Sequence, residues 1–355
     1  MKLFTRLWII IVLVHCFSAT FCQDIGFSQF YDQPLLRNPA LAGIFTGDMR
    51  FTASYRNQWE SVTVPYRTFG LSSEVKLPVH FINDDNLTFG LQMLRDIAGT
   101  SEFSTTQMLP AINLSIPVGA NSFYSLAVMA GPVQQRFDQT KLVFNDQFVA
   151  GSNGNFSILP SSRQVFSKTD VNYVDLSFGL SLNGTIGNDI DYYVGGGVFH
   201  ALEPNVAFFD AKEVKLNRKF TTNFGMYIPL NEDDNFIIYG DYFRQAKVNT
   251  FQCGFMYSRV LSFSDNDKVQ TAITGGILYR MDDAIIPVIE LHISKFTIGT
   301  SYDVNISKLA VASQYRGGVE LTLSYTDLFG RNKTGDRQWR CPKFGQMPGG
   351  DFIGY

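Results

Sequence analysis

Apolar and polar residues alternate along most of the chain with a period of two. Leu176, Phe178, Leu180 and Leu182, for example, are separated by polar or small residues. Successive side chains of a strand point to opposite faces of its sheet, so this spacing predicts strands with one apolar and one polar face. Such runs recur at regular spacing with Gly, Asn and Asp between them, and predict about fourteen strands, over residues 48–58, 67–77, 86–96, 103–116, 122–137, 172–184, 190–202, 219–230, 235–245, 248–262, 269–281, 285–294, 295–305 and 312–326.

Alternation by itself fits two classes of protein, a soluble all-β sandwich or barrel and a membrane barrel. Here the strands follow one another in one unbroken stretch, with no linker and no shift in composition. An even number of strands also suits closure, which leaves no unpaired strand edge facing lipid. The pattern therefore favours an all-β fold, a closed antiparallel transmembrane β-barrel.

Composition supports the membrane barrel. The chain has 32 Phe, 16 Tyr and 30 Gly but only 17% charged residues, whereas a soluble domain usually has about 25%. Beyond the first residues, no segment offers the roughly eighteen consecutive apolar residues that a membrane-spanning helix needs. The longest uncharged run, 103–135, is interrupted by Pro110 and Pro117. An aromatic-rich, charge-poor chain without apolar helices is typical of a barrel that crosses a membrane with strands.

The N-terminus has the pattern of a secretory signal peptide. Lys2 and Arg6 precede a mostly apolar stretch, 7–17, and small residues lead to Cys22, after which we expect cleavage. The expected organisation is a signal peptide at 1–22, a periplasmic or plug segment at 23–47, the outer-membrane barrel at 48–326 and a periplasmic tail at 327–355.

Charge and side-chain chemistry argue against several functions. Without Lys2 and Arg6, 27 basic residues face 32 acidic ones, and a mild net negative charge argues against a nucleic-acid partner. His80, His200 and His292 have no second His or Cys at metal-ligand spacing. No Gly-rich phosphate loop lies between a strand and a helix. We expect no enzyme, no cofactor and no bound metal.

Several polar residues fall on the inward faces of predicted strands. Glu290 and His292 could form a polar pair in a conducting lumen, or pack against Arg or Tyr inside a filled barrel; we favour the second interpretation. Arg50 and Arg56 are expected to pair with inward carboxylates such as Glu74.

The two cysteines of the mature chain are expected to be free thiols. Cys253 alternates with Phe251 and Phe255 on an apolar face and should point to lipid, whereas Cys341 lies in the C-terminal tail. A disulfide would need their Cα atoms within about 7 Å of each other. A lipid-facing position for Cys253 and a tail position for Cys341 argue against a disulfide between them.

The two longest connections, 138–171 and 203–218, follow the fifth and seventh strands, so both should be extracellular if the termini are periplasmic. Exposed aromatics on a long loop indicate either a folded-in cap that plugs the barrel or a recognition surface, and both interpretations remain open here. The candidate partner-binding residues are Phe144, Phe148, Phe156 and Phe166.

On the periplasmic side, the expected partner surfaces are 24–46 and the tail. The tail is basic, which suits an acidic periplasmic partner or simply solvent. Its basic residues are Arg331, Lys333, Arg337, Arg340 and Lys343.

Several segments, taken in order, carry a resemblance to a known family. They read DIGFSQFY at 24–31, PLLRNPALAG at 34–43, YRNQW at 55–59, GGGVFH at 195–200, SYDVN at 301–305 and CPKF at 341–344. With this order and content, the chain resembles the PorP/SprF family of type IX secretion system membrane proteins. The resemblance covers nearly the whole mature chain.

Membership would imply an outer-membrane component of type IX secretion and, in gliding bacteria, of surface motility. PorP-like members work with the periplasmic ring of the secretion machine. SprF-like members pair with a large surface adhesin and help export or anchor it. The expected partners are therefore outer-membrane lipid, an exported adhesin or other type IX cargo, and periplasmic subunits of the machine. The NPAL sequence at 38–41 also resembles the start of fatty-acid-transporter-like barrels, which leaves a channel for small hydrophobic solutes as the alternative.

Overall fold

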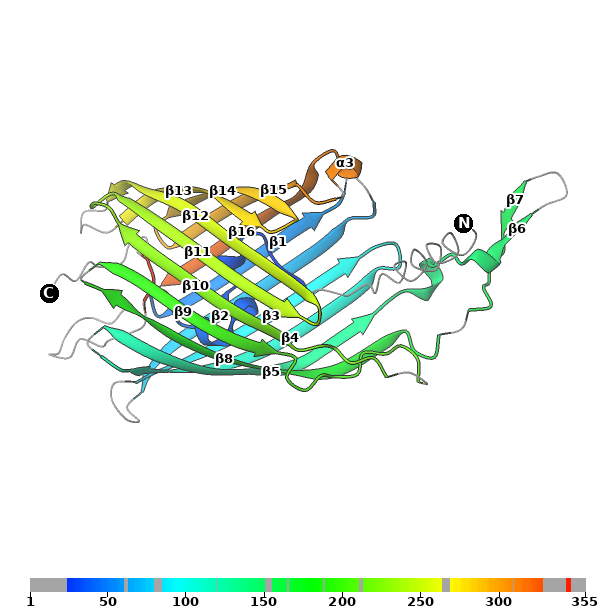
Figure 1. Ribbon diagram of the computed structural model, residues 1–355, viewed down its shortest axis with the longest axis horizontal. Coiled ribbons are helices and arrows are strands. Elements are labelled where there is room, and N and C mark those ends of the chain that lie inside the picture. Colours follow the sequence, from blue (N-terminus) through cyan, green and yellow to red (C-terminus); the bar gives the residue numbers. More distant parts are fainter. Residues whose placement is uncertain are drawn as a thin grey trace, which may run out of the picture.

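Fourteen antiparallel strands form one closed barrel (Figure 1). The computed structural model describes residues 24–60, 63–79, 85–119, 121–150, 155–164, 166–187, 189–210, 213–263, 269–308, 310–327 and 343–345. The predicted barrel of about fourteen strands is thereby confirmed. Its strands are β1 (Met49–Gln58), β2 (Tyr66–Val79), β3 (Asp85–Ala98), β4 (Phe103–Pro117), β5 (Ser122–Arg136), β8 (Asp170–Ile186), β9 (Ile190–Phe199), β10 (Lys219–Pro229), β11 (Asp234–Gln245), β12 (Val248–Phe263), β13 (Val269–Arg280), β14 (Ala284–Ile293), β15 (Phe296–Asn305) and β16 (Arg316–Asp327).

The barrel closes between its first and last strands. β1 pairs with β16 from Met49 opposite Asp327 to Gln58 opposite Gly318. Every barrel strand therefore has two hydrogen-bonded neighbours, as a wall in lipid requires.

Two predicted strand ends differ from the structure by three residues or more, each for a local reason. β9 ends at Phe199 rather than near residue 202, because His200 adopts a positive φ of 56° that leaves the extended conformation. β16 begins at Arg316 rather than near 312, because Ala310–Ser313 forms a helical turn, α3.

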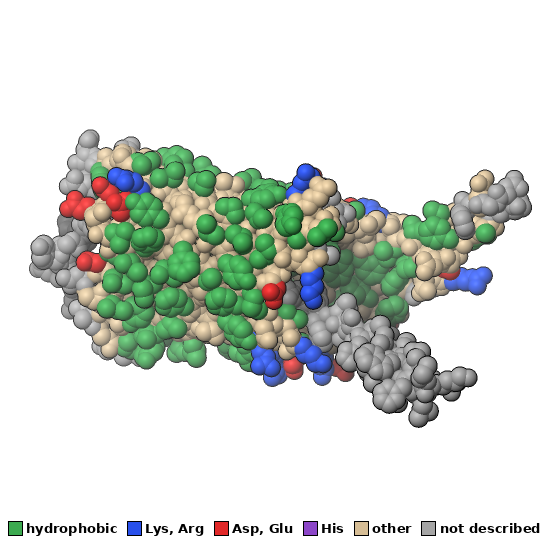
Figure 2. All heavy atoms as spheres, turned by 45° about the horizontal axis from the view of Figure 1, so that its top comes forward, with side chains coloured by type: hydrophobic (Ala, Val, Ile, Leu, Met, Phe, Trp, Pro, Cys, Tyr) green, Lys and Arg blue, Asp and Glu red, His purple; other side chains and the backbone are tan. Residues whose placement is uncertain are grey.

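The two faces of the wall differ in polarity. Leu180 and Phe178 of β8 are 59% and 48% exposed on the outside, whereas Ser181 and Asn183 of the same strand are buried inside. Figure 2 shows hydrophobic side chains covering the visible wall, with charged side chains gathered towards its two ends. An apolar exterior and a polar interior are what a barrel in lipid requires. In the part of the chain described, no helix is both long and apolar enough to span a membrane.

The two ends of the barrel are unlike. The long connections 137–169 and 200–218 lie at one end, here called the loop end. The opposite end, the turn end, holds short connections such as 187–189 and 230–233 and the start of β1.

Some short elements lie outside the wall. A hairpin of β6 (Phe148–Ala150) and β7 (Phe156–Ile158) sits in the 137–169 connection and projects away from the barrel (Figure 1). The sequence pattern had predicted no strand there. The same connection contains the 3₁₀ turns η3 (Gln139–Lys141) and η4 (Asn145–Gln147), while η1 (Phe30–Asp32), α2 (Pro34–Arg37) and η2 (Pro39–Leu41) precede β1.

Candidate functional site: a filled lumen and a projecting loop

The segment before β1 runs lengthwise through the barrel, and Figure 1 shows its helical turns, in dark blue, inside the wall. At the loop end, Asp24 contacts His200, which follows β9. At the turn end, the Asp48 N–H donates to the Asp327 carbonyl. Between them Leu35 and Asn38 are fully buried. The prediction that 24–46 offers a periplasmic partner surface is therefore wrong, because the wall covers most of this segment.

The Asn-Pro-Ala turn of this segment is seated against β8 and β9. The side-chain amide of Asn38 donates to the Leu180 carbonyl at 3.0 Å, and its oxygen caps the Ala40 N–H at 2.9 Å. The Ser181 hydroxyl donates to the Ala40 carbonyl at 2.9 Å. Because Asn38 of the turn and Ser181 of the wall satisfy the backbone groups of Ala40, the turn can be buried without losing these hydrogen bonds.

Glycines make that close approach possible. A Cβ added at Gly179 of β8 would overlap the side-chain oxygen of Asn38, and one added at Gly195 of β9 would lie 2.8 Å from its nitrogen. The NPAL and GGG segments, which are far apart in the sequence, are therefore two sides of one contact.

A buried ion pair fixes the middle of the segment. Both Arg37 and Asp241 of β11 have almost no exposed side-chain surface, and their Nη2–Oδ1 distance is 2.7 Å. Asn223 and Gln252 also donate to the Asp241 carboxylate. The guanidinium lies 5.1 Å from the centre of the Phe30 ring. A fully paired buried charge of this kind holds its element in one position.

A second network binds the segment towards the loop end. The Glu320 carboxylate accepts from the N–H groups of Ser28 and Gln29, at 2.6 and 2.8 Å. Asp303 lies 2.7 Å from both Arg56 and Arg280. The Ser28 hydroxyl donates to Asp303. The segment is therefore attached to both β16 and β15.

The expectation for the two inward arginines of β1 is confirmed. Arg50 lies 2.7 Å from Glu74. Arg56 pairs with Asp303 and lies 3.7 Å from Glu320, on β15 and β16 rather than on the strand that carries Glu74.

A polar latch holds the outermost described residue, Asp24. Its carboxylate lies 2.9 Å from His200 Nε2 and 3.2 Å from Lys219 Nζ, and Gln245 donates to its other oxygen. His200 Nδ1 lies 2.9 Å from Asp175.

The latch shifts the pKa values of its members. Burial alone would lower the pKa of His200, but the carboxylates of Asp24 and Asp175 raise it to about 9. Burial would raise the pKa of Asp24, but Lys219 and His200 hold it well below its usual range. Both groups are therefore charged at neutral pH.

Glu290 and His292 form contacts inside a filled barrel, as favoured from the sequence. The Tyr31 hydroxyl donates to Glu290 at 2.6 Å. His292 lies 3.6 Å from Glu290 and has Thr274 and Thr297 hydroxyls at 2.9 Å from its ring nitrogens. These contacts agree with packing inside a filled barrel, in which both residues also line a small cavity.

Residues 343–345 of the C-terminal tail pack inside the barrel at the turn end. The Phe344 ring centre lies 4.9 Å from that of Tyr193 and 5.9 Å from that of Tyr239. The Thr46 hydroxyl donates to the Gly345 carbonyl. The last residue of the CPKF segment thus packs against the wall. The remaining basic residues of the tail, Cys341 and the expected signal peptide lie outside the described residues.

At the loop end, aromatic residues join the two long connections. The Phe166 ring centre lies 6.0 Å from that of Phe144, 4.9 Å from that of Phe137 and 5.5 Å from that of Phe209. Phe137 also meets Phe208 at 5.1 Å. The structure therefore brings Phe144 and Phe166 together with partners that the sequence did not identify. The adjacent Phe208 and Phe209 in the second long connection were the available signal.

The hairpin beyond this cluster is apolar and exposed. Phe148, one of the candidate residues, is 49% exposed at the start of β6, and only the strand position of Phe156 is described. Hydrophobic side chains are visible along this projection in Figure 2. The geometry does not fit a cap folded into the lumen. The exposed apolar residues are Val143 (55%), Phe148 (49%), Val149 (41%), Ile158 (57%) and Leu159 (45%).

The fold and the filled lumen define a plugged β-barrel membrane protein. The family described as "Type IX secretion system membrane protein PorP/SprF" matches residues 19–325, and the chain belongs to that family. No curated protein matches.

Solved structures resemble the chain in fold only. The toluene transporter TbuX of Ralstonia pickettii is 9% identical, with 85% of this chain and 95% of that one covered and a TM-score of 0.47. A Pseudomonas aeruginosa FadL homologue is 8% identical over 81% and 92%, with a TM-score of 0.45. BamA from Haemophilus ducreyi is 10% identical over 79% and 70%, with a TM-score of 0.41.

Proposed function

We propose that the protein is a sealed, non-enzymatic scaffold of the type IX secretion system in the outer membrane. Its loop end binds an exported partner such as a gliding adhesin and supports its export or anchoring, while its periplasmic side meets the secretion machine. Family membership supports the system. The filled lumen supports the role, because residues 24–48 occupy the path that a solute would take.

The projecting hairpin is the surface that best suits the exported partner. Large exposed apolar patches on a protein usually mark interaction sites. The hairpin carries such residues on a support that the phenylalanine cluster holds to the barrel. Deleting residues 149–165 should abolish adhesin display while the barrel stays inserted and heat-modifiable on a gel.

A substitution pair gives a sharper test with less change to the loop. Phe148→Ser with Ile158→Ser should reduce recovery of the exported partner in co-purification from native membranes followed by mass spectrometry. The matched control is Val311→Ser with Tyr315→Ser, which removes exposed apolar residues from another connection at the same end. Equal recovery with both pairs would argue against the hairpin. If co-purification with the wild-type protein recovers no component of the secretion system, the proposal is wrong.

The alternative is a channel for small hydrophobic solutes. It would require the N-terminal segment to leave its ion pairs during transport. Planar-bilayer conductance and solute uptake of the purified barrel separate the two functions, and a sealed barrel rules out the channel.

A further inference from the structure

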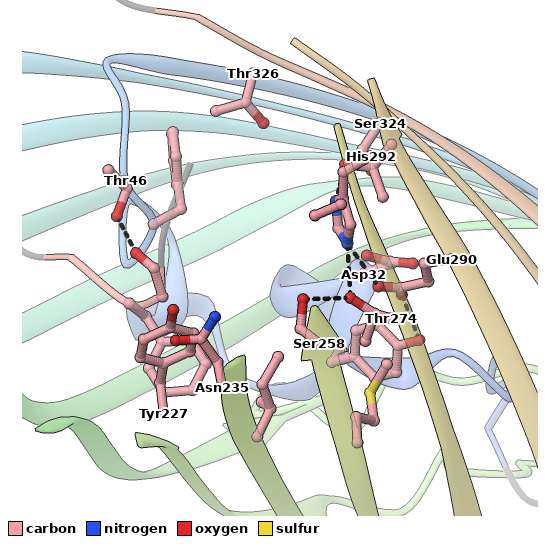
Figure 3. A pocket seen from close by; sticks show the side chains of 18 of the residues that line it. Asp32, Thr46, Tyr227, Asn235, Ser258, Thr274, Glu290, His292, Ser324 and Thr326 are labelled. Carbon is pink, nitrogen blue, oxygen red and sulfur yellow. Dashed lines mark hydrogen bonds and ion pairs between the residues drawn. The ribbon is translucent and has the colours of Figure 1, made fainter. Parts of the chain in front are cut away.

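A cavity of about 170 Å³ opens within the barrel near its turn end (Figure 3). The N-terminal segment, the inner faces of β10 to β16 and β1, and the tail residues Phe344 and Gly345 line it. Figure 3 shows Asp32, Glu290 and His292 on one side and Tyr227 and Asn235 on the other. None of these groups belongs to the proposed loop-end surface.

Two carboxyl groups, those of Asp32 and Glu290, line the cavity. Arg50 reaches it, but its guanidinium donates twice to Glu74, at 3.0 and 2.7 Å, and lies 4.5 Å from the Phe45 ring centre. The ring nitrogens of His292 lie beside threonine hydroxyls. The carboxyl groups of Asp32 and Glu290 therefore remain without a paired cation among the described residues that line the cavity.

Two buried acceptors in the lining lack a hydrogen-bond donor among the described residues. They are Oδ1 of Asn235, a residue that is only 3% exposed, and Oδ2 of Asp32. Leaving such an acceptor unsatisfied costs about 1–3 kcal/mol. Both acceptors favour a ligand that donates hydrogen bonds, and a carboxyl group without a cation beside it favours a cationic ligand.

The remaining lining combines hydroxyl side chains, such as Ser258 and Thr326, with an apolar part. Met256, Val260 and Ala272 are buried side chains on neighbouring strands β12 and β13. They form a surface suited to an alkyl stem that carries its charge at the tip. A lysine side chain combines such a stem with three ammonium donors.

We propose that the cavity at the turn end binds the side chain of a lysine presented by a protein partner, with its ammonium group at Asp32 and its stem along Met256, Val260 and Ala272. The site would serve as a docking point at the end of the barrel opposite the hairpin. It does not depend on which partner the loop end binds.

Calorimetric titration of the mature chain, refolded in detergent, tests the site. The probe is N-acetyl-lysine methylamide, compared with its neutral isostere N-acetyl-norleucine methylamide and with putrescine, a free diamine. The lysine probe should bind at least about tenfold more tightly than the norleucine probe, a difference of about 1.4 kcal/mol. Equal affinities would overturn the proposal. Tighter binding of putrescine than of the lysine probe would overturn the assignment to a protein side chain.

Two variants at the same end of the barrel distinguish binding at a specific site from non-specific attraction to acidic residues. Asp32→Asn should weaken the lysine probe about tenfold or more. Glu232→Gln removes an exposed acid in the connection between β10 and β11 and should leave affinity unchanged. An equal loss in both variants would mean that no specific site exists.

A thiol-reactivity measurement covers the case in which Asp32→Asn does not fold. Ser258→Cys introduces a small thiol into the cavity lining in a chain whose Cys253 and Cys341 are changed to Ser. Relative to their rates with a free thiol, the cationic reagent aminoethyl methanethiosulfonate should react at least about tenfold faster than the anionic sulfonatoethyl reagent. Added lysine probe should slow the reaction of the cationic reagent with Cys at position 258. Equal relative rates, or no protection, would contradict the site.

Discussion

Arg37 and Asp241, separated by 204 positions in the sequence, form two parallel hydrogen bonds of 2.7 Å inside the barrel. Arg37 belongs to the segment that fills the lumen and Asp241 to the wall. The pair is the most deeply buried charged contact between plug and wall described here, with side chains 4% and 0% exposed. Its loss therefore tests how firmly the lumen is closed.

Arg37→Met should destabilise the folded barrel by about 3–5 kcal/mol, because it leaves a buried carboxylate without its cation. The midpoint of urea unfolding in detergent measures the loss, and single-channel recording should show new conductance if the segment loosens. Lys168→Met is the control, because it breaks an exposed pair with Asp210 that is worth about 0–1 kcal/mol. A similar small effect of both substitutions would mean that the buried pair does not hold the plug.

Gly179→Val should displace the Asn-Pro-Ala turn, since a Cβ at this position overlaps the Asn38 side chain and approaches the Ala40 nitrogen to 2.6 Å. Overpacking of this kind costs about 1–3 kcal/mol, and proteinase K should then cut the N-terminal segment faster than in the wild type. The same change at Gly275 of β13, where an added Cβ meets nothing within 4 Å, should leave cleavage unchanged. Unchanged cleavage in the Gly179 variant would show that the turn is not seated as described.

The latch at Asp24 should open at high pH. Folding raises the pKa of His200 from 6.5 to about 9, so its stabilising contribution is complete below about 6.5 and is lost as the pH rises through about 9. Asp24 acts in the opposite direction: its pKa is lowered on folding, so its contribution is present above 3.8 and is lost as the pH falls through the lowered folded-state value.

NMR of the labelled imidazole should give a titration midpoint for His200 near 9, and proteinase K cleavage of the N-terminal segment should accelerate above that pH. His200→Gln should remove this acceleration, whereas His292→Gln, at the other end of the lumen, should keep it. A midpoint near 6.5 would show that the ion pairs with Asp24 and Asp175 do not form in solution.

Cys253 should be a free thiol that faces lipid. It lies between the exposed Phe251 and Phe255 on β12, and the structure describes it as unpaired. Mass mapping without reduction should find both Cys253 and Cys341 unmodified, and Cys253 should react with a membrane-soluble maleimide but not with a charged one. A Cys253–Cys341 disulfide would contradict the outward register of β12.

The sequence by itself determined the wall. Alternation is a local property, because each side chain of a strand faces opposite to its neighbours, so strand number and strand faces could be predicted from short windows. Glu74 could be expected for Arg50 for the same reason: adjacent strands place their inward residues side by side, and the two residues are directly paired in register.

Only the tertiary structure decided which residues fill the lumen and how the long connections pack at the loop end. Residues 24–48 contain no periodic pattern, and their burial depends on Asp241 and Glu320, more than 200 positions away. Likewise, Phe137 meets Phe208 and Phe166 meets Phe209 only because the ends of β5 and β9 lie at the same end of the barrel. Which side chains meet across a lumen or between loops is set by barrel closure and strand register together, and no window of the sequence contains both.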